Sequence, residues 1–128
     1  MTQSKFFKSS ELQCRCGCGL AVMDLGFLEK LDVLRASFGR PLTLSSAYRC
    51  PKHNAAVSET GERGPHTAGK AADILAHGPD AVTLLRLASQ QGFTGIGVSQ
   101  RGFSGSRFLH VDMLSASEGF PRPNLWSY

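Results

Sequence analysis

The sequence lacks the features that mark a membrane, secreted or repeat protein. Its apolar runs are too short to span a bilayer, so we expect no membrane insertion. The first residues, Met1 to Lys8, lack an apolar segment followed by a small-residue cleavage site. We therefore expect that the protein has no signal peptide and is made in the cytoplasm. Internal repeats are also absent, and 128 residues suit one domain covering residues 1–128.

A run of basic residues is missing as well, although the net charge is +4. Nucleic-acid-binding domains usually gather Lys and Arg on one face or along one helix, whereas here these residues are scattered. A positive protein is still drawn to polyanions, of which an anionic cell wall is one. We therefore expect no nucleic-acid partner.

The four cysteines lack the C-x2-C pairs that are typical of structural zinc sites. Cys14, Cys16 and Cys18 alternate along the chain, and Cys50 follows much later. Alternate cysteines are poorly placed to bridge each other, so a disulfide would join one of the three to Cys50. Reduced structural thiols, a single disulfide and a second metal site remain open alternatives.

What is present predicts an α+β fold with about three helices and a small, mainly antiparallel sheet. The ends of the chain, residues 1–13 and 121–128, read as irregular, with Phe6, Phe7, Leu12 and Trp126 packed against the body. Apolar periodicity and Gly or Pro boundaries give the other elements. The expected helices are 24–38, one starting at Pro51, and 78–91; the expected strands are 41–46, 71–75, 93–98 and 106–113, the last two forming a hairpin.

Two of these strands carry polar side chains that need a partner. Asp73 lies on the buried strand 71–75, and an unpaired carboxylate there would cost several kcal/mol. His110 and Asp112 share one face of the last strand, and His66 ends a polar loop. Imidazole nitrogen and carboxylate oxygen both bind zinc, so the sequence predicts a zinc cleft on one face of the sheet.

An ordered series of motifs adds a family resemblance. The stretch from Ser45 to Asn54, then His66 to Asp73, then the Leu-His-Val-Asp of residues 109–112, and finally the Trp-Ser-Tyr of residues 126–128 follow one another at plausible separations. The series resembles the zinc D-Ala-D-Ala carboxypeptidase family, also called the LAS metallopeptidases, which includes phage endolysins and murein endopeptidases. The resemblance runs from about residue 6 to the C-terminus.

The resemblance implies that His66, Asp73 and His110 hold one zinc ion per chain. It places a substrate-contacting arginine at Arg49, which would stabilise the oxyanion or grip a carboxylate, with Ser45 beside it as a second substrate contact. A structural ion pair is the alternative role for Arg49.

The positions where the family usually carries its catalytic base hold no acid or histidine in this sequence. Many members carry a catalytic acid three residues before the last ligand, or a His-x-His, and those positions are Arg107 and Phe108 here. The His-x-Asp branch is the closer match, which makes Asp112 the candidate catalytic base. The alternative is that Asp112 orients His110.

The resemblance thus predicts a zinc peptidase that hydrolyses amide bonds in the peptide part of bacterial peptidoglycan. It would be a D-Ala-D-Ala carboxypeptidase or a murein endopeptidase of endolysin type, acting as a monomer and reaching the wall through a lysis system or on a phage particle. Two other hypotheses are kept. One is a non-catalytic zinc domain that binds cell wall or a protein; the other is a thiol hydrolase using Cys50 with His53 or His66.

Overall fold

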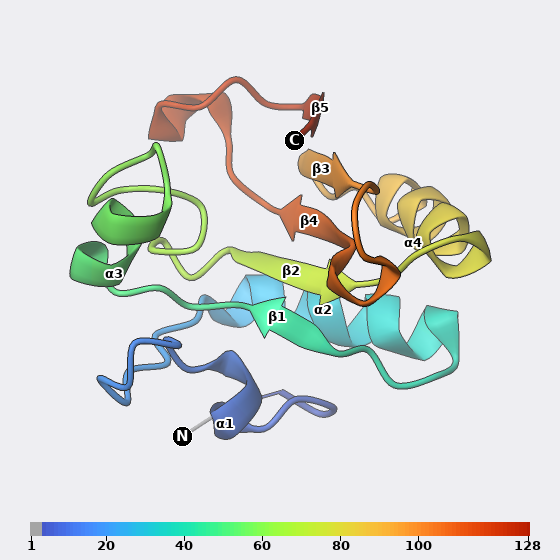
Figure 1. The fold of residues 1–128 in the computed structure, drawn as a ribbon, viewed down its shortest axis with the longest axis horizontal. Coiled ribbons are helices and arrows are strands. Elements are labelled where there is room, and N and C mark those ends of the chain that lie inside the picture. The colour runs from blue at the N-terminus through green and yellow to red at the C-terminus, as the bar shows by residue number, and fades with distance from the viewer. Residues whose placement is uncertain (1–3) are drawn as a thin grey trace.

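The computed structural model describes residues 4–128 and has the expected α+β architecture (Figure 1). The elements, in chain order, are α1 (Ser9–Leu12), α2 (Leu25–Phe38), β1 (Leu44–Ser46), α3 (Pro51–Val57), β2 (Ala71–Leu75), α4 (Pro79–Gln90), β3 (Gly95–Ser99), β4 (Phe108–Asp112) and β5 (Asn124–Ser127). Two single 3-10 turns, η1 (Ser104–Ser106) and η2 (Ala116–Glu118), flank β4. The helices and strands predicted in the interior of the chain are all present.

The sheet has the strand order β1-β2-β4-β3-β5. The pairs β1–β2, β2–β4 and β3–β4 are antiparallel, which confirms the mainly antiparallel sheet and the predicted hairpin. The last pair, β3–β5, is parallel.

Strand β5 corrects the prediction of an irregular tail. Hydrogen bonds at both ends extend the pairing: Asn124 N–H donates to Thr94 O (2.9 Å), just before β3, and Tyr128 N–H, just after β5, donates to Val98 O (3.2 Å). The edge of β3 would otherwise present unpaired backbone groups. A tail of four residues after two prolines has too little alternation to reveal a strand, because its pairing is set by the sheet it meets.

The lead-in predicted over residues 1–13 begins outside the described residues and is only partly irregular. Ser9–Leu12 forms the short helix α1. Phe7 and Leu12 are buried, as predicted, whereas the Phe6 ring lies at the surface near the guanidinium of Arg35. Tyr48 N–H donates to Leu12 O (3.0 Å), so the lead-in is tied to the segment that follows β1.

Helices α2 and α4 cover one face of the sheet and build the core. Asp24 caps α2 by accepting a hydrogen bond from Phe27 N–H (2.9 Å), and Gly39 ends it in the left-handed conformation (φ 80°). The core residues of these elements are fully or almost fully buried. They include Phe27, Leu28, Leu31 and Leu34 of α2, Leu84 and Ala88 of α4, and Ala72, Ile74, Ile96, Leu109 and Val111 of the strands.

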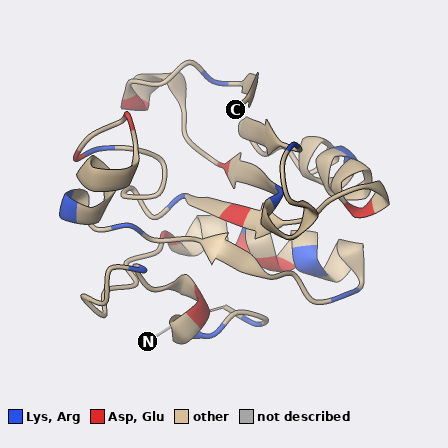
Figure 2. Cartoon of the chain, in the orientation of Figure 1, with Lys and Arg blue, Asp and Glu red and all other residues tan. Residues whose placement is uncertain are grey.

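The charged residues are spread over the surface. Lys and Arg lie on helices and loops all around the fold, with Asp and Glu interspersed among them (Figure 2). Within residues 4–128, every helix is too short or too polar to cross a membrane.

Candidate metal centre

The pairing of β2 with β4 brings Asp73 and His110 together. These two residues are direct partners in the antiparallel register. Their neighbours Ile74 and Leu109 point into the core, so by alternation Asp73 and His110 share the opposite face. Both side chains are almost completely buried, with exposed fractions of 6% for Asp73 and 2% for His110.

His66 reaches the same point from the loop that joins α3 to β2. Its Nδ1 lies 2.7 Å from the carbonyl oxygen of Ala47. A carbonyl can only accept, so Nδ1 carries the proton and Nε2 is left with a free lone pair. That Nε2 atom lies 3.3 Å from Asp73 Oδ1.

Gly69 allows the loop to reach the strand. It adopts a left-handed conformation (φ 72°), and a Cβ atom there would collide with the carbonyl oxygen of Val22. Glycine is therefore required between His66 and Asp73.

His110 completes the set of donors. Its Nδ1 lies 3.0 Å from Asp73 Oδ1, and its Nε2 lies 2.7 Å from Asp112 Oδ2. When Nε2 donates to Asp112, Nδ1 is free to bind a metal, which is the usual arrangement for a metal-bound histidine and its carboxylate partner.

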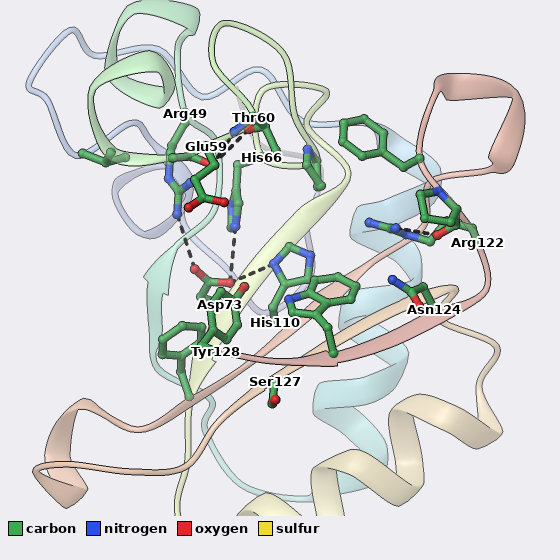
Figure 3. Close-up of a pocket in the computed structure, with 17 residues that line it drawn as sticks. Arg49, Glu59, Thr60, His66, Asp73, His110, Arg122, Asn124, Ser127 and Tyr128 are labelled. Carbon is green, nitrogen blue, oxygen red and sulfur yellow. Dashed lines mark hydrogen bonds and ion pairs between the residues drawn. The ribbon is translucent and has the colours of Figure 1, made fainter.

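The three side chains fit a zinc ion in chemistry and in spacing. Their ligand atoms all lie within 4.8 Å of one another (Figure 3). Two imidazoles and one carboxylate are a common zinc ligand set, and tetrahedral coordination at about 2.0–2.1 Å separates donor atoms by about 3.3 Å. The separations of 3.0 and 3.3 Å from Asp73 Oδ1 match that value.

The charges of the cluster favour an ionised carboxylate. Burial by itself would raise the pKa of Asp73, but His66 and His110 outweigh it and hold the pKa well below its usual range. For His110, burial lowers the pKa, and the hydrogen bonds to Asp112 and Asp73 more than reverse this, so its pKa is raised. A proton therefore competes with a metal ion for this histidine.

Asp112 lies behind His110 and is completely buried. Arg122 holds it with two hydrogen bonds, Nε to Oδ1 (2.9 Å) and Nη2 to Oδ2 (2.8 Å), and Leu114 N–H donates to Oδ1 (3.3 Å). Burial opposes ionisation, but His110 and Arg122 together lower the pKa of Asp112 to about 2. Gly95 makes room for this carboxylate, because a Cβ atom there would overlap it.

The three candidate ligands line a pocket of about 810 Å³. Trp126 of β5 forms part of its wall, with its ring centroid 5.1 Å from that of His110. A Cβ atom at Gly97 would lie 2.6 Å from Trp126 Nε1, so glycine on β3 lets the indole lie over the sheet. The other lining residues are Arg49, Val57, Ser58, Glu59, Thr60, Pro65, Phe108, Phe120, Pro121, Arg122, Asn124, Ser127 and Tyr128. The tail thus closes one side of the pocket.

Arg49, which the family resemblance implies to be a substrate contact, lines this pocket. Its Nη2 is 3.5 Å from Asp73 Oδ2, while its Nε and Nη1 donate to Ser46 Oγ (3.2 Å) and Asn54 Oδ1 (3.1 Å). The guanidinium is therefore fixed beside the oxygen of Asp73 that faces away from the two histidines (Figure 3).

Ser45, predicted as a substrate contact, does not line the pocket; its side chain is exposed, and the neighbouring Ser46 holds Arg49 instead. The reason is an irregularity in β1, where Leu44 pairs with Ile74 but Ser46 pairs with Asp73. One extra residue shifts every later side chain to the other face. A strict period of two would have placed Ser45, not Ser46, beside Asp73.

Two residues that line the pocket have no role in the sequence-based prediction. Glu59 lies in the polar loop that leads to His66, and Arg122 lies in the tail that was predicted to be irregular. A signal for Arg122 existed, because Asp112 on a buried strand needs a cationic partner and the tail offers one. Glu59 gave no such signal.

One comparison with known proteins, that with family models, found a match. No curated protein matches the chain. The family described as Peptidase M15 matches residues 5–112, which include Arg49 and all three candidate ligands. The predicted resemblance is thereby confirmed: the chain belongs to the M15 family of zinc D-Ala-D-Ala carboxypeptidase-like peptidases.

Proposed function

We propose that the protein is a zinc-dependent peptidase that hydrolyses amide bonds in the peptide part of bacterial peptidoglycan. One observation carries the proposal. In a member of the M15 family, the donor atoms of His66, Asp73 and His110 converge at the wall of an open pocket, with Arg49 beside them.

His66 Nε2, Asp73 Oδ1 and His110 Nδ1 would hold the zinc ion. When bound, the ion supplies a Lewis acid that polarises a carbonyl group and activates water. Arg49 would bind the carbonyl oxygen of the scissile amide or a substrate carboxylate. This role for Arg49 is supported by its position in the pocket and by the three partners that fix its guanidinium.

We assign Asp112 the orienting role rather than the role of base. Both of its oxygens are engaged, by His110, Arg122 and the backbone of Leu114, and its side chain is shielded from solvent. A base must come within hydrogen-bond reach of the proton that it removes. Asp112 instead keeps the proton of His110 on Nε2, which leaves Nδ1 as the metal-binding atom.

Glu59 is our candidate for the base. Among the described residues that line the pocket, those with a side-chain carboxylate are Asp73 and Glu59, and Asp73 has a ligand role. Glu59 is exposed and has no hydrogen bond to a pocket residue that would occupy it. Its carboxylate would take a proton from the attacking water and pass it to the nitrogen of the leaving amine.

A non-catalytic zinc domain that binds cell wall or a protein is the second candidate. It is favoured by Arg107, which occupies the position where many relatives carry an acid and is held by hydrogen bonds to Gly102 O. In that case the pocket would bind the same peptides without cleaving them.

The test is mass spectrometry of purified peptidoglycan after incubation with the zinc-loaded protein. We expect new fragments whose masses name the bond, either loss of a terminal D-Ala or an internal cut. They should disappear with a chelator and in His66→Ala. Intact peptidoglycan from several wall chemotypes, with zinc bound at one ion per pocket, would overturn the peptidase and favour the binding domain.

A further inference from the structure

All four cysteines of the chain gather at one point outside the pocket. The Sγ atoms of Cys14, Cys16, Cys18 and Cys50 all lie within 4.8 Å of one another. The Sγ–Sγ distances are 3.4 Å between Cys14 and Cys16 and 3.7 Å between Cys16 and Cys50. All four are free thiols. Three come from one loop, and the fourth is the N-cap of α3.

The spacing is that of a tetrahedral metal site. A Zn–S bond of about 2.3 Å places neighbouring sulfur atoms about 3.8 Å apart in a tetrahedron. A disulfide would engage two cysteines and give the other two no reason to converge. Four sulfur atoms at one point are instead a ligand set that favours zinc over the oxygen-preferring ions Mg²⁺, Ca²⁺ and Mn²⁺.

The backbone around the cluster is arranged to receive thiolates. Cys50 N–H points at Cys14 Sγ (3.4 Å), and His53 N–H points at Cys50 Sγ (3.4 Å). Such N–H groups stabilise negative charge on sulfur. Gly17 and Gly19 adopt left-handed conformations (φ 89° and 80°), which turn the chain after each of the last two cysteines of the loop.

The loop is also fixed from outside the cluster. The guanidinium of Arg15 donates to four backbone carbonyl groups, those of Ser10, Glu11, Gln13 and Leu44. Cys14 N–H donates to Leu20 O (2.8 Å), which closes the loop. The thiols are therefore held together by the fold around them.

We propose that Cys14, Cys16, Cys18 and Cys50 form a second, structural zinc site in which the ion is bound by four thiolates. Binding converts the four thiols to thiolates and releases their protons to solvent. All four positions are taken by protein, so this site has no open position for water or substrate. The ion clamps the loop of residues 14–18 to the start of α3.

The clamp lies next to residues of the pocket. Cys50 directly follows Arg49, and Ala47, three residues earlier, accepts the hydrogen bond from His66 Nδ1. Loop 14–18 thus braces the segment that positions Arg49 and His66, although the zinc site itself does not depend on the proposed peptidase function.

The test is zinc content, measured by plasma mass spectrometry on protein purified with a reductant. We expect two zinc ions per chain in the wild-type protein. Asp73→Asn should retain one ion, in the cysteine site. The double variant Cys16→Ser, Cys18→Ser should retain one ion, in the pocket; both of these thiols are exposed, so the substitution opens no cavity. The matched control is His53→Ala, which removes a nearby imidazole outside the cluster and should keep two ions.

Cobalt substitution identifies the ligands without using activity. In the Asp73→Asn background, bound Co²⁺ should show sulfur-to-cobalt charge transfer in the near ultraviolet and strong tetrahedral d–d bands, and both should vanish with Cys16→Ser, Cys18→Ser. Three results would overturn the proposal. They are Co²⁺ bound without charge transfer, zinc content unchanged by the double cysteine variant, or two rather than four thiols titrated in protein unfolded with a chelator and without reductant.

Discussion

Strands β2 and β4 have one apolar face and one polar face. Ile74 and Leu109 face the helices and are buried among apolar side chains, while their sequence neighbours Asp73 and His110 face the pocket. Each pair is separated by a single peptide bond. The apolar face therefore contributes stability that offsets the cost of burying charged and polar groups on the pocket face. We expect substitutions on the two faces to have different consequences.

The largest effect should come from the pocket face. Asp73→Asn removes one candidate ligand and leaves the shape of the side chain almost unchanged, so peptidoglycan cleavage should fall to background and the pocket ion should be lost. Cleavage rate and zinc content measure this. Asp80→Asn is the matched control, because Asp80 forms an exposed ion pair with Arg40 and should leave both values unchanged. Normal cleavage by Asp73→Asn would contradict the assignment.

Glu59→Gln should lower kcat by about 10²–10⁴-fold, because the glutamine amide cannot accept the proton of the attacking water. The zinc content should not change. Steady-state kinetics on a synthetic peptidoglycan peptide, with zinc in excess, measure this.

Asp112→Asn should act differently and through the metal. We expect zinc affinity at the pocket to fall about 10–100-fold, because His110 loses the carboxylate that orients it, while kcat at saturating zinc changes much less. A competition titration with a coloured chelator gives the affinity. If Asp112→Asn lost kcat with zinc fully bound, and Glu59→Gln did not, the base would be Asp112.

On the core face, Leu109→Ala should lower the free energy of unfolding by about 2–5 kcal/mol, because it opens a cavity beneath the sheet. The candidate zinc ligands should be unaffected, so zinc-bound protein that remains folded should keep its kcat. Urea unfolding measures the stability, with Val82→Ala on the exposed side of α4 as control. Loss of kcat with unchanged stability would blur the distinction between the faces.

The smallest effect concerns pH. The raised pKa of His110 means that, below that pKa, each zinc ion must displace a proton, so affinity should increase about tenfold per pH unit. Above the pKa of His110 this dependence should level off. The hydrogen bond to Asp112 is the larger cause of the raised pKa of His110. In Asp112→Asn the pKa of His110 should therefore be lower, and the zinc affinity should stop rising at a lower pH. Titrations at a series of pH values measure the two curves.

Much of the pocket face could be predicted from the sequence. The period of two in strands predicts that Asp73 points to one face of β2 and that His110 and Asp112 share one face of β4. A buried carboxylate needs a partner, which indicates a site at Asp73. The assignment of His66 to the same site depended on the family resemblance, because the local sequence of a polar loop does not predict where its residues lie in the folded protein.

The features that could not be predicted depend on tertiary contacts. The bulge in β1 places Ser46 rather than Ser45 opposite Asp73, and the bulge arises from the pairing of β1 with β2. Strand β5 forms because β3 has a free edge, and it delivers Trp126 to the pocket and brings the tail that carries Arg122. The cysteine spacing C-x-C-x-C argued against a zinc site by analogy with C-x2-C pairs, yet the fold gathers all four sulfur atoms.

The most direct test of the polar face is a crystal structure of the zinc-loaded protein with diffraction data collected on both sides of the zinc absorption edge. We predict an anomalous difference peak about 2.0–2.2 Å from His66 Nε2, Asp73 Oδ1 and His110 Nδ1, with the Nε2 of His110 still bonded to Asp112. A map without a peak at that position, or with the ion held by other side chains of the pocket, would contradict the account.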